Sequence, residues 1–199
     1  FDCKDLFVTV RINGADTEFF EKDLEEIIPC APAAVRLPKC NGLEDVLLAD
    51  KKITELEARH GIPVGSVKLH AMIETALGLE MAFAIASATP RVSALTIGGQ
   101  DFTADMGVRK TKEGRELFYA RCRIVAAARA AGVDSYDTVW ADIQDNEGLL
   151  RETREIVGLG FTGKACIHPS QVAVIHKAFV PTEKELRKAE RVVEAAEKA

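Results

Sequence analysis

Residues 7–14 read FVTVRING, and this stretch decides between the two folds that fit the rest of the chain. The run from Phe7 to Ile12 is rich in β-branched residues and predicts a strand. A nucleotide-binding open sheet would follow its first strand with a GxGxxG or GxxxxGK[ST] loop that holds phosphate. The segment Arg11-Ile-Asn-Gly14 matches neither pattern. The first strand therefore favours a barrel over an open nucleotide-binding sheet.

The alternation of strand-like and helix-like segments continues to the end of the chain. Strands are expected at residues 7–12, 33–37, 67–73, 94–97, 138–141 and 164–168. Helices are expected at residues 16–28, 43–60, 76–87, 114–131, 147–158, 171–179 and 181–198. Strands that alternate with helices of this length indicate βα units and a parallel sheet. Six such units with no linker between them predict one α/β domain over residues 1–199 that forms most of a TIM (β/α)8 barrel.

Composition excludes several classes of protein. The chain has 47% hydrophobic and 29% charged residues and a net charge of −5, and its basic residues are scattered, which argues against a nucleic-acid partner. Its five cysteines are odd in number and form no CxxC pair, so we expect reduced thiols in the cytoplasm rather than disulfides or a zinc site. It contains no apolar run of about 20 residues, so no membrane span is expected.

Polar side chains stand where the predicted strands end, at the rim where a barrel carries its catalytic groups. They are Arg11, Asn13, Arg36, Lys39, Glu74, Thr75, Gln100, Asp101, Asp142 and His168. Any one of them is more often simply solvated than catalytic. Arg11, Glu74 and Asp101 differ, because each follows an apolar run and is expected at the inner edge of the barrel mouth.

Two carboxylates at the ends of adjacent strands repel each other unless a cation lies between them. Mg²⁺ accepts one or two protein carboxylates and fills its other positions with water and substrate oxygens, so Glu74 and Asp101 predict a magnesium site. Arg11 would supply a planar cation for a carboxylate or a developing enolate oxygen. Gly98 and Gly99 would let the backbone approach a ligand, with N–H groups facing anionic oxygen, or would simply form a turn.

Four further residues have alternative interpretations. His168 in CIHPSQ is either an acid–base group or a hydrogen-bonded residue of the rim, and Cys166 is expected in the core rather than as a nucleophile. Lys39 either reaches a phosphate of a thioester carrier or is solvated. A Schiff base on Lys39 or Lys164 would define a metal-independent aldolase, which the pairing of Glu74 with Asp101 argues against.

Several motifs occur together in a fixed order: VRING, AAVRLPK, AMIETALGLEMAFAIA, IGGQDFTADMG, DTVWADIQDNEGLLRE and GFTGKACIHPSQ. In this order they closely resemble the citrate lyase β-subunit family, which includes malyl-CoA and citramalyl-CoA lyases. The resemblance runs from about Phe7 into the last helix. It implies a TIM barrel, usually in a trimer or hexamer, that cleaves or forms a carbon–carbon bond next to a thioester with Mg²⁺.

The resemblance also implies roles for individual residues. Arg11 would bind substrate and stabilise the thioester enolate, and Glu74 and Asp101 would hold the metal. The backbone from Gly98 to Asp101 would contact the carboxylate of the keto acid. Family members commonly have Gly-Ala-Glu-Asp where this chain has Gly98-Gly-Gln-Asp101. The metal-binding aspartate is kept, but Gln100 removes a neighbouring charge, which bears on the fine substrate preference.

The implied reaction is cleavage of a citryl-type 3-hydroxy acyl thioester to a keto acid such as oxaloacetate and an acetyl thioester. The carrier would be coenzyme A or an acyl-carrier protein, with citrate lyase carrier and transferase subunits as possible partners. A stand-alone malyl-CoA or citramalyl-CoA lyase, a metal-dependent 2-keto acid aldolase and a scaffold subunit with a decayed site stay open. The family also has two earlier βα units, one ending in LDLED, so we expect the natural chain to be longer upstream.

Overall fold

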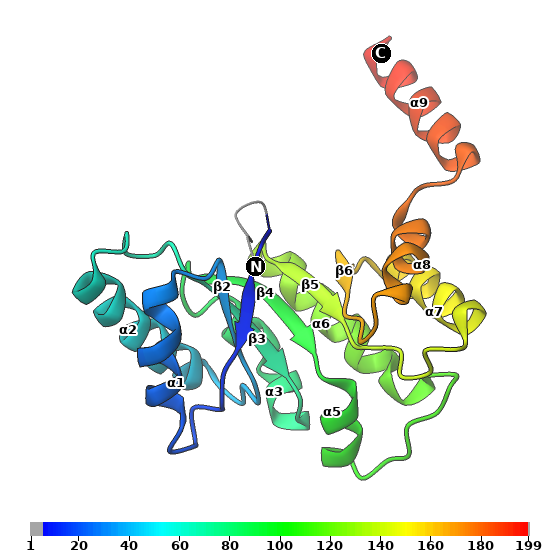
Figure 1. Cartoon of the computed structure of the whole chain (residues 1–199). Helices are drawn as coiled ribbons and strands as arrows, with labels where there is room; N and C mark the ends of the chain where they lie inside the picture. Colours follow the sequence, from blue (N-terminus) through cyan, green and yellow to red (C-terminus); the bar gives the residue numbers. More distant parts are fainter. Residues whose placement is uncertain (1–5, 199) are drawn as a thin grey trace.

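Six parallel strands form one sheet, in which every strand lies beside its neighbours in the sequence (Figure 1). The computed structural model describes residues 6–198. The strands are β1 (Thr9–Arg11), β2 (Ala34–Leu37), β3 (Lys68–Ile73), β4 (Val92–Ile97), β5 (Asp134–Asp137) and β6 (Gly163–Lys164). Parallel neighbours need a crossover connection, and helices supply it here.

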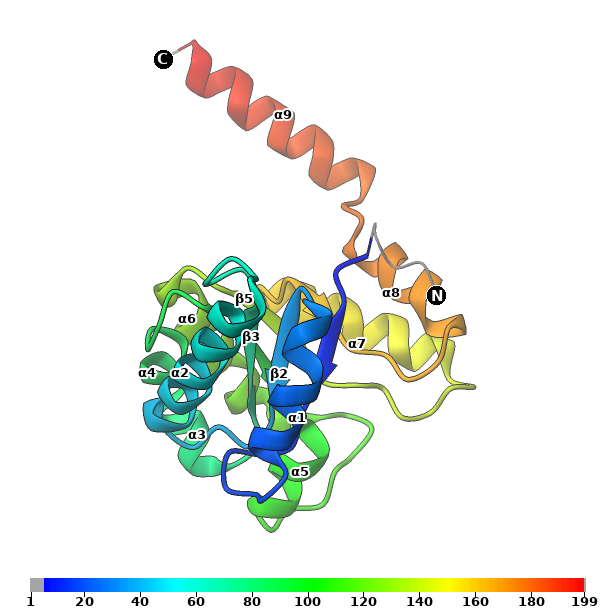
Figure 2. The same cartoon turned by 60° about the vertical axis from the view of Figure 1, so that its left-hand side comes forward.

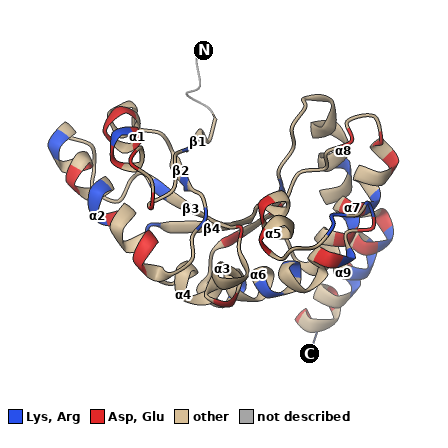
Figure 3. Cartoon of the chain, turned by 90° about the horizontal axis from the view of Figure 1, so that it is seen from below, with Lys and Arg blue, Asp and Glu red and all other residues tan. Residues whose placement is uncertain are grey.

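The sheet is curled, so that its strands line an open trough and most helices cover the outer side (Figures 2 and 3). The α-helices are α1 (Phe20–Ile27), α2 (Leu43–His60), α3 (Ala76–Glu80), α4 (Ala82–Ala86), α5 (Gly99–Asp105), α6 (Phe118–Ala131), α7 (Asn146–Leu159), α8 (Ser170–Phe179) and α9 (Glu183–Glu197). Two short 3-10 helices are η1 (Ile28–Cys30) and η2 (Arg115–Leu117). This curled half-barrel confirms the predicted TIM-barrel class.

Alternate residues along each strand face opposite sides of the sheet. The outward-facing set packs against helices in the main hydrophobic core and includes Val35, Leu37, Leu69, Ile73, Leu95 and Ile97. Helices α2 and α6 contribute Leu56 and Ile124 to the same core. Full burial of a side chain of this size contributes about 1.5–3 kcal/mol. The alternate set faces the trough and is largely polar, which leaves that side of the sheet for a functional site.

The fifth strand differs from the prediction. The sequence predicts the strand at residues 138–141, which are β-branched and apolar. The structure has β5 at Asp134–Asp137, with Tyr136 paired to Thr96 of β4. Aspartate is depleted in strands, so the DSYD segment does not resemble one. Asp137 is tolerated because Arg121 and Lys164 pair with its carboxylate. A tertiary ion pair therefore overrides the local propensity.

Other element boundaries also differ. The sixth strand is Gly163–Lys164 rather than residues 164–168. The helix expected at 76–87 is divided at Met81 into α3 and α4, and the helix expected at 114–131 begins as η2. Helix α5, which starts at Gly99, was not predicted because Gly98 and Gly99 at its start are poor helix formers.

Helix α9 extends away from the rest of the chain (Figures 1 and 2). None of its residues is buried, although Thr182 and Glu185 form a capping box at its start. Within residues 6–198, no helix combines the length and the hydropathy that a membrane crossing requires.

Candidate active site

A cavity of about 450 Å³ opens at the carboxyl ends of the strands. The five residues predicted for the site all line it: Arg11, Glu74, Gly98, Gly99 and Asp101. Arg36 and Gln100, which also follow or end predicted strands, line it as well. The structure thus brings together residues that are far apart in sequence, as expected for parallel strands that end at one rim.

Glu74 is a buried carboxylate of the cavity, with 3% of its surface exposed. Its Oε2 accepts the backbone N–H of Lys39 at 2.8 Å. Burial raises the pKa of Glu74, the Lys39 N–H lowers it, and the Asp101 carboxylate raises it further, with a net upward shift. A second negative charge therefore makes ionisation of Glu74 harder, which is the situation that a bound cation would relieve.

Asp101 lies in the first turn of α5, and its side chain is exposed. Together with Glu74 it offers two carboxylates to the cavity, which fits Mg²⁺ because this ion takes one or two protein carboxylates and keeps other positions for water and substrate. Within the described residues there is no cluster of three or more His, Cys, Asp and Glu side chains that could enclose a metal. The donor set suits an open magnesium site rather than a closed structural one.

The structure gives a different reason for glycine at positions 98 and 99 from the one predicted. The Gly98 N–H donates to Ile73 O at 3.0 Å, and the Gly99 N–H donates to Thr138 Oγ1 at 3.1 Å. These N–H groups are therefore used within the protein rather than offered to an anion. A Cβ on Gly98 would overlap the Glu74 side chain, and a Cβ on Gly99 would lie 3.0 Å from Thr138 atoms. The glycines make room for their neighbours.

Other rim candidates do not line the cavity. Thr75 caps α3, and the Asn13 side chain donates to Asp23. His168 is exposed and its Nδ1 lies 2.8 Å from Ser170 Oγ, at the start of α8. Cys166 was expected in the core, but it is exposed, because β6 ends at Lys164 and the chain leaves the sheet.

The cysteines in the described part of the chain carry free thiols. They are Cys30, Cys40, Cys122 and Cys166. Cys3 lies outside the described residues. Burial raises the pKa of the Cys40 thiol, so that residue is a packed, protonated side chain rather than a nucleophile.

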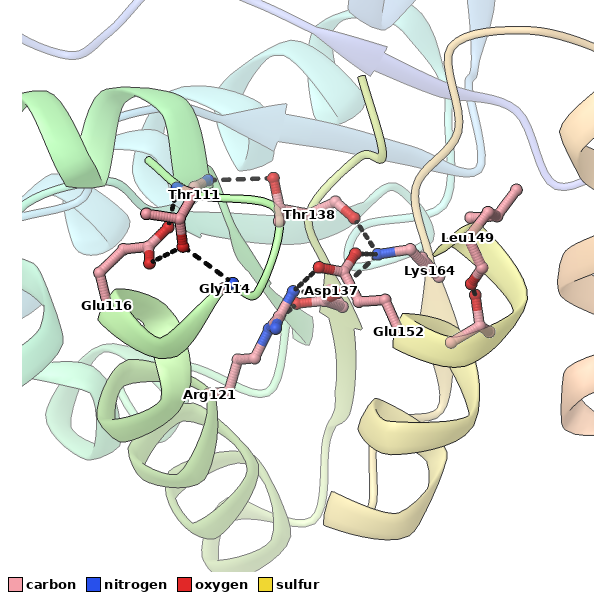
Figure 4. A network of polar contacts seen from close by, with 11 residues as sticks. Thr111, Gly114, Glu116, Arg121, Asp137, Thr138, Leu149, Glu152 and Lys164 are labelled. Atoms are coloured by element: carbon pink, nitrogen blue, oxygen red, sulfur yellow. Dashed lines mark hydrogen bonds and ion pairs between the residues drawn. The ribbon is translucent and has the colours of Figure 1, made fainter. Parts of the chain in front are cut away.

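A buried ionic network, of which Asp137, Thr138 and Lys164 also line the cavity, was not foreseen from the sequence (Figure 4). Arg121 donates from Nε to Asp137 Oδ1 at 2.9 Å and from an Nη to Asp137 Oδ2 at 3.0 Å. Lys164 Nζ donates to Asp137, to Glu152 and to the Thr138 carbonyl at 2.7, 2.6 and 2.7 Å. Burial lowers the pKa of Arg121, but Asp137 and Glu152 outweigh it and raise the pKa overall.

The network bears on the chemistry of Lys164. Its side chain is 0% exposed and all three donors of an ammonium have acceptors. A lysine that forms a Schiff base must instead be neutral and able to reach a carbonyl carbon. Lys164 is therefore a structural cation, which links Asp137 to the Thr138 backbone and, through the Thr138 hydroxyl, to Gly99.

The inner face of the sheet forms the floor of the cavity. Arg36 and Thr96 line it, and His70 lies beside them on β3, paired in register with Arg36. Arg36 Nε, His70 Nδ1 and Thr96 Oγ1 are buried and have no hydrogen-bond partner among the described residues. Tyr136 also lines the cavity and packs edge-on against the His70 ring.

Burial of His70 predicts a loss of stability in acid. Burial lowers its pKa to about 4, helped by Arg36 and opposed by Asp134, from an ordinary value of 6.5. Below pH 6.5 the unfolded chain binds a proton that the native state refuses until about pH 4, so stability falls as the pH falls through this window. We expect His70→Gln to remove on the order of 2–3 kcal/mol of that loss, measured by urea unfolding at several pH values.

The control is His60→Gln, because His60 is exposed at the end of α2. That variant should keep the pH dependence of the wild type. An unchanged slope between pH 6.5 and 4 in His70→Gln would show that other groups cause the acid loss.

The geometry agrees with comparisons of the chain with known proteins. Residues 3–169 match the HpcH/HpaI aldolase/citrate lyase family. The chain is 40% identical to the citrate lyase subunit beta of Haemophilus influenzae, covering 98% of this chain and 67% of that protein. It is 35% identical to the mitochondrial citramalyl-CoA lyase of Rattus norvegicus, covering 98% of this chain and 60% of that protein.

Among solved structures, it matches a citrate lyase beta subunit of M. tuberculosis complexed with oxaloacetate and magnesium. The TM-score is 0.73 at 34% identity, over 87% of this chain and 73% of that one. The chain spans about two thirds or less of the curated relatives' length, so their activities do not follow from the match alone. The family does follow: the chain belongs to the HpcH/HpaI aldolase/citrate lyase family.

Proposed function

We propose that the protein is a magnesium-dependent carbon–carbon lyase that cleaves a 3-hydroxy acyl thioester of the citryl type. The products would be a keto acid such as oxaloacetate and an acetyl thioester. The observation that carries the proposal is the convergence of Arg11, Glu74 and Asp101 on one cavity at the carboxyl ends of parallel strands. The M. tuberculosis relative, complexed with oxaloacetate and magnesium, supports both the metal and the product class.

Glu74 and Asp101 would hold Mg²⁺, with Glu74 oriented by the Lys39 N–H. When bound there, Mg²⁺ supplies a Lewis acid that acidifies the substrate hydroxyl and polarises the carbonyl that forms from it. Removal of the hydroxyl proton lets the oxygen electrons form the keto group. The carbon–carbon bond breaks, and its electron pair passes to the acetyl thioester as an enolate. Arg11 stabilises this enolate until a proton reaches its carbon.

Further parts of the proposal concern the protein's setting. We place it in the cytoplasm as one domain of a homotrimer or hexamer, with the thioester on coenzyme A or an acyl-carrier protein. With an acyl-carrier protein as the carrier, citrate lyase carrier and transferase subunits would be its partners. A stand-alone citramalyl-CoA or malyl-CoA lyase is the alternative that the rat relative favours. A Schiff-base aldolase is disfavoured because three acceptors occupy Lys164.

Removal of the Asp101 charge tests the metal site. We expect Asp101→Asn to lower Mg²⁺ affinity tenfold or more in calorimetry, because an amide oxygen is a weaker ligand than a carboxylate. Stability should change little, since Asp101 is exposed. Cleavage of a citryl thioester, followed by the keto acid it releases, should stop in EDTA and return with Mg²⁺.

The matched control is Asp105→Asn on the same helix. Asp105 accepts the Ala76 N–H at 2.8 Å, and asparagine keeps an oxygen for that bond while losing the same charge. Its Mg²⁺ affinity should stay near the wild-type value. Wild-type affinity in Asp101→Asn would remove Asp101 from the ligand set, and activity that survives EDTA would contradict the metal-dependent reaction.

A further inference from the structure

We propose that Arg36 binds a second carboxylate of the substrate, so that the site selects substrates that release a dicarboxylic keto acid. This inference rests on the proposed lyase function and adds the specificity of that site. A citryl thioester differs from a malyl thioester by one carboxymethyl group. Oxaloacetate likewise differs from pyruvate by one carboxylate. A single cationic group in the right place would distinguish these pairs.

The position of Arg36 in the sheet is the first observation in favour of this role. It lies on β2, paired in register with Arg11 on β1 and with His70 on β3, and it lines the same cavity as Glu74 and Asp101. The carboxylates belong to the ends of β3 and the start of α5, whereas Arg36 projects from within a strand. The cavity therefore has Glu74 and Asp101 at its mouth and Arg36 on its floor, while Lys164, which also lines it, is paired with Asp137 and Glu152.

Buried polar atoms without hydrogen-bond partners are the second observation in favour of this role. Arg36 Nε is buried with no acceptor among the described residues, and Thr96 Oγ1 on the same floor is also unpaired. Thr96 is 4% exposed. Buried polar groups without partners are costly, and a guanidinium fork fits a carboxylate with two parallel hydrogen bonds. A ligand carboxylate would satisfy both residues at once.

The charges around Arg36 are the third observation in favour of this role. Burial lowers the pKa of Arg36, the nearby Tyr136 raises it, and the positive charge of Arg11 lowers it further. Two cations on one wall of a cavity attract a multiply charged anion. Mg²⁺ held by Glu74 and Asp101 would attract the hydroxyl and its adjacent carboxylate, which leaves the additional carboxymethyl group of a citryl substrate for Arg36.

The alternative is that Arg36 only stabilises the fold. In that case its loss would lower stability and would affect all keto acids alike. The two interpretations therefore differ in the ratio of affinities for oxaloacetate and pyruvate. That ratio is the quantity to measure.

The experiment uses the natural full-length protein and calorimetric titration of oxaloacetate and of pyruvate, each with saturating Mg²⁺. We expect Arg36→Gln to weaken oxaloacetate binding about 10- to 100-fold and pyruvate binding less than about twofold, as for loss of a hydrogen-bonded charge pair. Arg36→Lys, which keeps the charge but loses the fork, should fall between Arg36→Gln and the wild type. Arg59→Gln, at the exposed end of α2, is the control and should bind both acids normally.

Equal weakening of both keto acids, or no change in either, would overturn the role of Arg36 while leaving the lyase proposal intact. A wild-type protein that binds neither acid with Mg²⁺ would instead overturn the proposed function. Steady-state kinetics provide a second reading: kcat/KM for a citryl thioester should fall relative to that for a malyl thioester in Arg36→Gln.

Discussion

Asp137→Asn is expected to destabilise the protein by about 3–5 kcal/mol, enough to unfold a domain of ordinary stability under mild conditions. Asp137 is fully buried as a side chain and accepts hydrogen bonds from both Arg121 and Lys164. The amide keeps the shape of the carboxylate but removes its charge. Two buried cations would then share one carboxylate of the network, that of Glu152, whose side chain is 12% exposed. Urea unfolding followed by circular dichroism measures the loss.

The control for Asp137→Asn is an exposed ion pair. Glu21 contacts Lys52 at 3.0 Å, and its side chain is 69% exposed. Water solvates such a pair in both states, so Glu21→Gln should leave the unfolding midpoint within experimental error. A comparably small change in Asp137→Asn would mean that water enters the network and neutralises the lost charge.

Gly98→Ala is expected to remove the metal site while the fold survives. The added methyl would overlap the Glu74 side chain, which must then rotate away from its position beside the Lys39 N–H. The backbone at Gly98 has φ −93°, which alanine also adopts, so the effect comes from this contact and not from strain. We expect Mg²⁺ affinity and lyase activity to fall about 100-fold or more, with a stability loss of about 1–3 kcal/mol.

Two further variants isolate the cause. Gly158→Ala adds the same methyl in open space within α7, and it should be neutral or stabilise by up to about 1 kcal/mol. If the contact with Glu74 is the cause, Gly98→Ala should cost no stability in a chain that already carries Glu74→Ala. A full cost in that background would place the strain elsewhere, and normal Mg²⁺ binding by Gly98→Ala would contradict the explanation.

The sequence predicts the parts of the site that depend on strand ends. Glu74 and Asp101 follow strands that pattern and length identify, and parallel strands bring their carboxyl ends to one rim. It does not reveal Asp137 or Tyr136, because their strand has the composition of a turn. This strand, β5, is stabilised by Arg121 from α6 and Lys164 from β6, which pair with Asp137. Such partners meet only in the folded chain.

The role of Gly98 shows the same limit on a smaller scale. A glycine after a strand is compatible with a turn, a bulge or a close ligand, and the sequence cannot choose among them. The structure shows that the neighbour is Glu74, a residue on a different strand. Arg36 is similar: its place at a strand is visible in the sequence, but its unpaired Nε is not.

The strand order has a consequence for how the chain acquires its structure. Because the order in the sheet is the order along the chain, each new strand pairs with the one that precedes it. Paired residues are separated by roughly 25 to 40 positions at each step, as for Val10 with Val35 and Thr96 with Tyr136. The entropy of closing loops of these lengths differs by well under about 1 kcal/mol. No strand has to wait for a distant partner, so the sheet can grow outward from any pair that forms early, one crossover at a time.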